Sequence, residues 1–227
     1  MSLFSSPLRS GIKAVLIGLL LFSMTPARAV DNPIILGQSC ALTGPAKNLG
    51  IEMRAGLLAA FAHINEQGGI NGRDIHLISL DDGYEPDKAV QNTRKLINED
   101  NVFLLIGEVG TPTSEAVAPI AEVHEIPFFA PFTGAELLRT PFRKYVINVR
   151  ASYYQEMEEL ASYLVDTMRF KRISCFYQND SYGYDGLQGI EQALARRCMQ
   201  LVSKASYERN TLSVMGSLQE IFRATPE

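Results

Sequence analysis

Four apolar runs decide the fold of this chain, and they lie between Ile34 and Thr133, in a stretch that opens with Ile34-Ile35-Leu36-Gly37. The second run ends at Asp81-Asp82, the third at Ile106-Gly107 and the fourth at Pro131-Phe132-Thr133. Helical patterns separate the runs, and strands that alternate with helices form right-handed βαβ units and a parallel sheet. The stretch is therefore predicted to be a doubly wound α/β lobe. Polar residues collect at the carboxyl ends of its strands, the edge where such lobes bind small molecules.

Local signals set the boundaries of these elements. Gly68-Gly69 ends the first helix, because glycine readily adopts the left-handed conformation of a helix cap. Pro86 marks the start of the second helix, where the missing N–H of proline costs nothing. We expect strands at residues 34–39, 73–80, 102–106 and 127–130, and helices at residues 48–67, 85–97 and 113–125.

A second α/β series follows a looser segment that begins after Leu138 and contains Pro141. We expect a short strand at residues 145–149 before this series begins, and within the series strands at residues 173–177 and 201–205 and helices at residues 154–168, 184–198 and 212–223. The predicted organisation is a signal peptide at 1–29, an N-terminal α/β lobe at 30–138, a connector or hinge at 139–150 and a partial second lobe at 151–227.

The first 29 residues are predicted to be a secretory signal peptide. Arg9 and Lys13 form a positive region, residues 14–22 form an uninterrupted apolar run, and Ala27-Arg28-Ala29 is a small-x-small cleavage signal. The alternative is an uncleaved membrane anchor. We disfavour it, because the apolar run is shorter than the roughly 20 residues that span a bilayer. We therefore expect an exported, periplasmic protein.

Charge and cysteine content narrow the functional classes. A formal net charge of -4 and a pI near 5.5 argue against nucleic-acid binding, which requires a basic face. Cys40, Cys175 and Cys198 are an odd number of cysteines, so at least one thiol stays free in an exported protein. Cys175 and Cys198 either pair or remain free thiols, and only the distance between their Cα atoms decides between these alternatives.

The loop after the third strand, residues 108–114, leads directly into a helix and carries several hydroxyl groups. Free N–H groups at the start of a helix favour an anion, and nearby hydroxyls add donors. The alternative is that Thr113 or Ser114 only caps the helix. Capping and binding can coexist in one loop, so we interpret this loop as a candidate anion-binding element.

Six motifs occur in one order across almost the whole predicted mature chain: Thr43-Gly44-Pro45, Ile64-Asn65-Glu66-Gln67-Gly68-Gly69-Ile70-Asn71-Gly72, Asp81-Asp82, Ile106-Gly107, Pro131-Phe132-Thr133-Gly134-Ala135-Glu136 and Asp180-Ser181-Tyr182-Gly183-Tyr184. In these motifs the chain resembles the periplasmic type I solute-binding proteins of the branched-chain amino acid (leucine/isoleucine/valine) ABC transporter family. The motif at the end of the first helix, followed by Asp-Asp, is the most specific of the six.

The resemblance implies the type I periplasmic binding protein fold, with doubly wound parallel sheets in two lobes and a ligand bound in the cleft between them. It implies an extracytoplasmic substrate-binding component of an ABC uptake system for a branched-chain or related small amino acid or amide. The expected partners are this small-molecule ligand and an ABC permease in the inner membrane, with no nucleic acid. We expect a monomer without a cofactor.

The resemblance also implies a set of ligand-binding residues: Thr111, Thr113, Phe132, Thr133, Gly134, Tyr153 and Tyr182. Thr111 matches the hydroxyl that holds the α-carboxylate of the ligand, and Tyr182 matches a tyrosine of the second lobe that closes on the ligand. The alternative for Tyr182 is a packed or surface tyrosine after a turn. Tyr153 lies where the second lobe enters the cleft, and its alternative role is structural packing. If several of these aromatic residues line the cleft, we expect a ligand larger or flatter than valine.

Motifs for catalysis, phosphate binding and metal binding are not found. The segment Gly68-Gly69-Ile70-Asn71-Gly72 follows a helix and precedes a strand, which reverses the Walker and Rossmann arrangements. His124-Glu125 lacks the second histidine of a zincin, and Asp81-Asp82 followed by Gly83 favours a turn. We therefore expect neither an enzyme nor a metal centre.

Members of the resembled family are considerably longer than this chain, so the second lobe is expected to be incomplete at its C-terminal end. We therefore do not expect submicromolar ligand binding by the 227-residue chain. Two alternatives to a transport receptor remain open. One is the ligand-sensing domain of a receptor or regulator, and the other is a non-functional fragment created by a premature stop.

Overall fold

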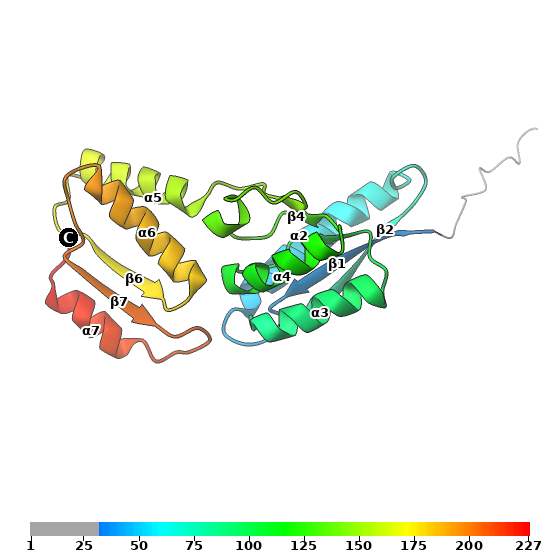
Figure 1. Cartoon of the computed structure of the whole chain (residues 1–227), viewed down its shortest axis with the longest axis horizontal. Helices are drawn as coiled ribbons and strands as arrows, with labels where there is room; N and C mark the ends of the chain where they lie inside the picture. The colour runs from blue at the N-terminus through cyan, green and yellow to red at the C-terminus, as the bar shows by residue number, and fades with distance from the viewer. Residues whose placement is uncertain (1–31) are drawn as a thin grey trace, which may run out of the picture.

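The computed structural model describes residues 32–227 and arranges them in two α/β lobes (Figure 1). The predicted signal peptide lies outside the described residues. The first lobe contains the strands β1 (Ile34–Cys40), β2 (Ile75–Asp81), β3 (Leu104–Ile106), β4 (Phe128–Phe129) and β5 (Val146–Ile147). Its helices are α2 (Lys47–Glu66), α3 (Pro86–Asn98), α4 (Thr111–Val123) and the 3₁₀ turn η1 (Glu136–Leu138). The second lobe contains α5 (Tyr153–Ala161), the π-helical turn η2 (Ser162–Thr167), β6 (Ser174–Gln178), α6 (Ser181–Ala195), β7 (Ser203–Tyr207) and α7 (Met215–Arg223).

The sheet of the first lobe is parallel throughout and has the order β2-β1-β3-β4-β5. The predicted α/β fold with a parallel sheet is therefore confirmed. From β2 the chain crosses past β1 to reach β3, so the strand order reverses between β1 and β3. In open α/β sheets a ligand binds outside the carboxyl ends of the strands at such a reversal. The topology therefore directs attention to the loops that follow β1 and β3.

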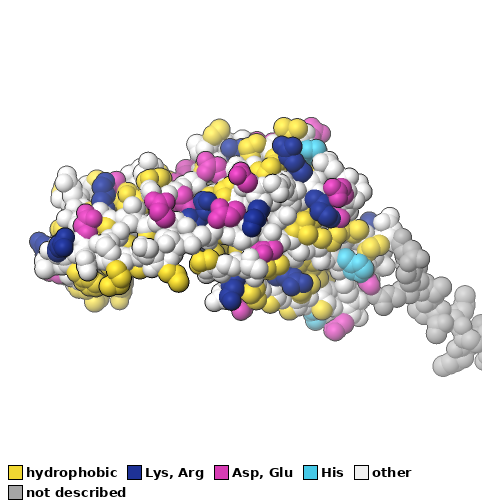
Figure 2. Space-filling model, turned by 90° about the horizontal axis from the view of Figure 1, so that it is seen from below, with side chains coloured by type: hydrophobic (Ala, Val, Ile, Leu, Met, Phe, Trp, Pro, Cys, Tyr) yellow, Lys and Arg dark blue, Asp and Glu magenta, His cyan; other side chains and the backbone are white. Residues whose placement is uncertain are grey.

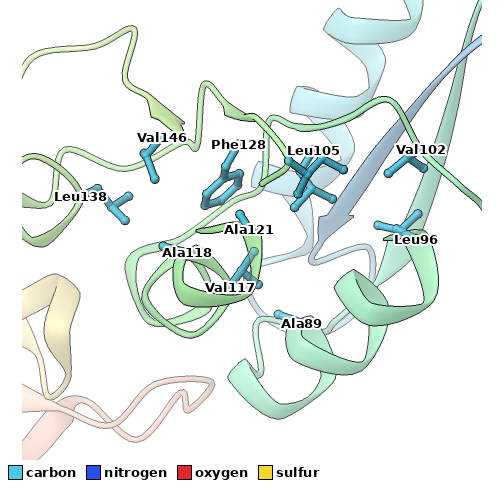
Figure 3. Packing of buried hydrophobic residues seen from close by; sticks show 11 residues of the cluster. Ala89, Leu96, Val102, Leu105, Val117, Ala118, Ala121, Phe128, Leu138 and Val146 are labelled. Carbon is cyan, nitrogen blue, oxygen red and sulfur yellow. The ribbon is translucent and has the colours of Figure 1, made fainter. Parts of the chain in front are cut away.

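The core of the first lobe lies on both faces of this sheet. Leu105 and Phe128 face α3 and α4 in one cluster, where they pack against Leu96 and Val117 (Figure 3). Ile106 follows Leu105 directly in the sequence but belongs to the opposite cluster, which is covered by Phe61 of α2. This alternation is that of a strand covered on both faces, and it explains why the strands read as continuous apolar runs.

The fifth strand lies inside the segment that the sequence assigned to the connector. Val146 of β5 pairs with Phe128 of β4, and Val146 itself belongs to the core of the first lobe. The backbone therefore leaves the first sheet only after Ile147, and the passage to α5 is correspondingly short.

The second lobe has a parallel two-stranded sheet of β6 and β7. In Figure 1, α5 and α6 lie on one side of these strands and α7 lies on the other. A buried cluster that includes Ile173, Ile190 and Leu194 forms its core. The sequence predicts one helix over residues 154–168, whereas the structure has an α-helix that ends at Ala161 and continues as the π-helical turn.

All three cysteines are free thiols in the structure. Cys40 is buried in the first lobe, Cys175 is half-buried on β6, and Cys198 is exposed after α6. Of the two alternatives for Cys175 and Cys198, the structure shows the unpaired one.

The surface carries charges of both signs and some exposed apolar side chains. On the face displayed in Figure 2, Lys and Arg side chains alternate with Asp and Glu side chains. Phe222 and Met215 of α7 are 71% and 65% exposed. Among residues 32–227, none of the helices combines the length and the apolar character needed to cross a bilayer.

Gly183, in the first turn of α6, permits a close approach between this helix and β6. A Cβ atom at Gly183 would lie 1.8 Å from the carbonyl oxygen of Gln178. We expect Gly183→Ala to lower the free energy of unfolding by about 1–3 kcal/mol, because the backbone of one element would have to move. Urea denaturation measures this difference.

Gly186 of the same helix provides the matched control. A Cβ atom at Gly186 would have no neighbour within 4 Å. Gly186→Ala should therefore leave stability unchanged or raise it by about 0.5–1 kcal/mol through the higher helix propensity of alanine. Equal effects of the two substitutions would contradict the close approach at Gly183.

Candidate functional site

A cavity of about 500 Å³ lies between the two lobes. Its first-lobe wall consists of loops at the carboxyl ends of the strands and of the start of α2, and includes Leu49, Tyr84, Val109, Gly110, Thr111 and Phe132. The opposite wall consists of the entry to the second lobe and of loops after β6 and β7, and includes Arg150, Tyr153, Glu156, Gln178, Tyr182 and Asn210. The cavity thus lies at the edge that the strand order predicts for a ligand site.

The loop from β3 to α4 forms the base of the cavity. Gly110 precedes α4 with φ of 115°, and a Cβ atom there would lie 2.0 Å from Cε2 of Tyr84, so only glycine fits. Within residues 32–227, no side chain caps the N-terminus of α4. The first N–H groups of this helix, beginning at Thr111, therefore remain a potential site for an anionic group.

Three hydroxyl groups connect the base of the cavity to the second lobe. Thr133 Oγ1 donates to the hydroxyl oxygen of Tyr153 at 3.2 Å and accepts from the N–H of Ala135 at 3.1 Å. Because the single proton of Thr133 is then used, Thr111 Oγ1 donates to Thr133 Oγ1, at 2.6 Å. The O–H of Tyr153 is left free to donate toward the cavity, and we call Thr111, Thr133 and Tyr153 the hydroxyl relay.

Of the seven residues that the resemblance implies, four line the cavity: Thr111, Phe132, Tyr153 and Tyr182. The other three lie behind its wall. Thr113 is fully buried, and its hydroxyl donates to the carbonyl oxygen of Val109 at 2.9 Å, which stabilises the loop. Thr133 is the middle of the hydroxyl relay. The carbonyl oxygen of Gly134 accepts the N–H of Tyr153 at 2.8 Å.

Tyr153 and Tyr182 occupy the starts of two helices in the second lobe. Ser152 and Gln155 form a capping box that places Tyr153 at the first position of α5. Asp180 caps α6 by accepting the N–H of Tyr182 at 3.1 Å. The two tyrosine rings meet edge to face, with centroids 5.5 Å apart.

Arg150 and Glu156 add an ion pair to the cavity wall. The two side chains bond directly, and each is about one-third exposed. The guanidinium carbon of Arg150 also lies 5.2 Å from the ring centroid of Phe132 and 5.4 Å from that of Tyr153. These contacts place a cation beside two aromatic rings at the point where the chain enters the second lobe.

Several cavity residues were missed by the sequence analysis, among them Tyr84, Arg150, Glu156, Gln178 and Asn210. Two of them had a usable signal, because Tyr84 follows the end of β2 and Gln178 ends β6, at the strand edge where ligands are expected. Asp81 and Asp82 form the predicted turn: the N–H of Gly83 donates to Asp81 at 2.9 Å and that of Tyr84 to Asp82 at 2.7 Å.

The lobes also touch beside the cavity, through four residues that we call the clasp: Gly83, Glu85, Arg209 and Asn210. Asn210 Nδ2 donates to the carbonyl oxygen of Gly83 at 3.0 Å and to Glu85 Oε1 at 2.6 Å. Arg209 Nη2 donates to Glu85 Oε2 at 3.0 Å. The clasp therefore links the turn after β2 to the loop after β7 and holds the lobes together in this structure.

Two acidic side chains are buried under the first-lobe wall. Burial raises the pKa of the Glu108 carboxyl well above its ordinary value, and the nearby Asp82 raises it further. Glu108 Oε1 has no hydrogen-bond partner in the described part of the chain. Burial also raises the pKa of Asp82, although hydrogen bonds from Tyr84 and Ser39 oppose the effect. The environment of both carboxyl groups therefore favours their neutral form more than water does.

Removal of Glu85 should open the cleft. We expect Glu85→Ala to lower the ratio of the closed to the open form about two- to five-fold, because exposed ion pairs and hydrogen bonds contribute up to about 1 kcal/mol each. Small-angle X-ray scattering should show a larger radius of gyration. Asp87→Ala removes an exposed acid from the first turn of α3, two residues from Glu85 and outside the clasp, and it should leave the scattering curve unchanged. Equal curves for both variants would contradict the role of the clasp.

Glu108 should make stability fall as pH rises. A carboxyl with a raised pKa in the folded state contributes its full stability below the unfolded value, 4.5, and loses it as pH rises toward the folded value. Glu108→Gln should therefore be about as stable as the original chain at low pH and become increasingly more stable than it as pH rises above 4.5, as measured by urea denaturation in a pH series. The exposed Glu115→Gln serves as the control, and a pH-independent difference for Glu108→Gln would contradict the prediction.

Comparisons with known proteins agree with this geometry. Residues 33–226 match the family model described as periplasmic binding protein. A possible leucine/isoleucine/valine-binding protein from Rhodopirellula baltica SH 1 is 40% identical, with a TM-score of 0.78 over 84% of this chain and 54% of that chain. A substrate-binding periplasmic protein from Ralstonia solanacearum is 31% identical, with a TM-score of 0.81 over 85% of this chain and 54% of that one.

Curated relatives point the same way. The Leu/Ile/Val-binding protein homolog 7 of Brucella suis biovar 1 is 26% identical over 209 residues, which cover 88% of this chain and 51% of that protein. The chain thus spans about half the length of the curated relatives it matches. Because the family model covers almost all described residues and a solved structure is 40% identical, the chain belongs to the periplasmic binding protein family, with relatives of the Leu/Ile/Val-binding type.

Proposed function

We propose that this chain is the ligand-binding part of a periplasmic receptor for an ABC uptake system, and that it binds a small amino acid or a related amide. The cavity of about 500 Å³ between the lobes carries this proposal. Its volume falls within the range of about 300–1,000 Å³ that is typical of small-molecule sites. Both lobes contribute to its walls, so a ligand in the cavity would contact both.

The walls offer partners for each end of an amino acid. A carboxylate fits at the uncapped start of α4, where backbone N–H groups and the free O–H of Tyr153 can donate to it. An ammonium group fits beside the carboxylate of Glu156 and the faces of the tyrosine rings, which attract cations. These partners for both ends of an amino acid support a binding function.

Closure of the lobes would convert binding into a transport signal. A ligand that contacts both walls favours the closed form, because it binds that form more tightly than the open one. In this proposal an ABC permease in the inner membrane recognises the closed lobes and receives the ligand. Genes for a permease and an ATPase beside the gene for this chain would support the proposal, and a neighbouring regulator gene would favour the sensor alternative.

The hydroxyl of Tyr153 provides a direct test of the site. Isothermal titration of the chain with leucine, isoleucine, valine and their amides should detect binding of at least one ligand. Tyr153→Phe keeps the ring and removes the O–H, so we expect affinity to fall about two- to ten-fold, which is the effect of one net hydrogen bond.

Tyr163 provides the matched control, because it is 56% exposed and lies outside the cavity. Tyr163→Phe should bind with unchanged affinity. The absence of heat with every ligand, or equal affinities for Tyr153→Phe and the original chain, would contradict the proposed site.

A further inference from the structure

Aromatic rings dominate the apolar surface of the cavity. Five of its lining residues are aromatic: Tyr84, Phe132, Tyr153, Tyr182 and Tyr207. Large aliphatic side chains in the lining are limited to Leu49 and Val109. A branched aliphatic ligand packs best against methyl groups, whereas flat ring faces match another flat group. The composition of the wall therefore differs from that expected for a valine-sized ligand.

The rings present open surface from opposite sides of the cleft. Phe132 belongs to the first lobe and is 39% exposed, and Tyr182 belongs to the second lobe and is 41% exposed. Large aromatic side chains gain free energy when a ligand removes this surface from water. Ring pairs also favour the edge-to-face or offset geometries that Tyr153 and Tyr182 already show, with an interplanar angle of 68°.

The cavity wall also carries a cationic side chain, Arg150, which could face the carboxylate of a ligand. Arg150 lies over the rings of Phe132 and Tyr153, and its partner Glu156 is also part of the cavity wall. Phe132 also forms a β-bridge with Val109, which lies two residues before the start of α4. A carboxylate would thus find a guanidinium and helix N–H groups beside the aromatic surface.

From this combination we infer that the cleft selects small carboxylates that carry an aromatic ring over aliphatic carboxylates of similar size. The inference rests on the proposed function, since it names the class of ligand for the same cavity. The ring would lie among the side chains of Phe132, Tyr182 and Tyr207, and the carboxylate would face Arg150 and α4. Two sources share this chemistry, aromatic amino acids and aromatic acids without an amino group.

Isothermal titrations of the full chain with four ligands separate the effect of the aromatic ring from the effect of the ammonium group. L-phenylalanine and L-leucine differ in the ring, and 3-phenylpropionate and 4-methylpentanoate repeat this difference without the ammonium group. We expect each aromatic ligand to bind about tenfold more tightly than its aliphatic counterpart. A preference within the aromatic pair identifies the source.

The outcomes are distinguishable. Binding of leucine or 4-methylpentanoate with affinity equal to or higher than that of the aromatic counterpart would overturn the inference and leave the proposed function intact. The absence of binding by all four ligands would overturn the inference, and it would overturn the proposed function as well if isoleucine, valine and the amides also gave no heat.

A substitution at Phe132 tests whether its ring causes the preference for aromatic ligands. Phe132→Leu retains an apolar side chain without a ring, so it should reduce the ratio of aromatic to aliphatic affinity by about five-fold or more. Phe142→Leu makes the same change at a residue that is 86% exposed and outside the cavity, and it should leave the ratio unchanged. Circular dichroism establishes that both variants are folded, and an unchanged ratio in folded Phe132→Leu would overturn the inference.

Discussion

The join between Gly134 and Tyr153 is the contact on which the cleft depends. The carbonyl oxygen of Gly134, in the loop after β4, accepts the N–H of Tyr153, the first residue of α5. A Cβ atom at position 134 would lie 2.7 Å from the Tyr153 ring, so glycine is what allows the ring to reach the cavity. The same ring carries the hydroxyl that ends the relay from Thr111 and Thr133. One backbone contact therefore aligns the two walls of the site.

The architecture was predictable because it depends on patterns that are local in the sequence. Apolar runs covered on both faces mark β1 and β3, and glycine and proline mark the ends of helices. The cavity was predictable only in part, since each side chain depends on distant partners. Thr111 and Thr113 are two residues apart in the first turn of α4, yet the Thr113 hydroxyl bonds back to Val109 whereas Thr111 reaches the cavity.

Other features of the cavity and the fold could be recognised only in the folded structure. Arg150 becomes a cavity residue because β5 joins the first sheet and shortens the passage to α5, so that its guanidinium lies over Phe132. Tyr84 adopts a φ of 65°, and Gly110 must be glycine to accommodate its ring. No periodicity or motif in the sequence indicates the backbone conformation of Tyr84 or the need for glycine at position 110. The π-helical turn after Ala161 likewise has no local signal that distinguishes it from a continuous α-helix.

The first-lobe wall carries features that oppose stability, and this fits a binding site. Glu108 and Asp82 are buried acids with raised pKa values, and Tyr84, whose N–H donates to Asp82, holds a left-handed backbone conformation that is costly for a residue other than glycine. Strained backbone and buried ionisable groups collect where function needs a fixed geometry. The clasp between Glu85 and the Arg209-Asn210 loop keeps the lobes together without using cavity groups on the α4 side. A ligand can therefore shift the equilibrium toward the closed form only if it contacts groups on both walls. A ligand with the same contacts in the open and closed forms would leave this equilibrium unchanged. The aromatic rings meet this requirement, since they line the cavity from both lobes.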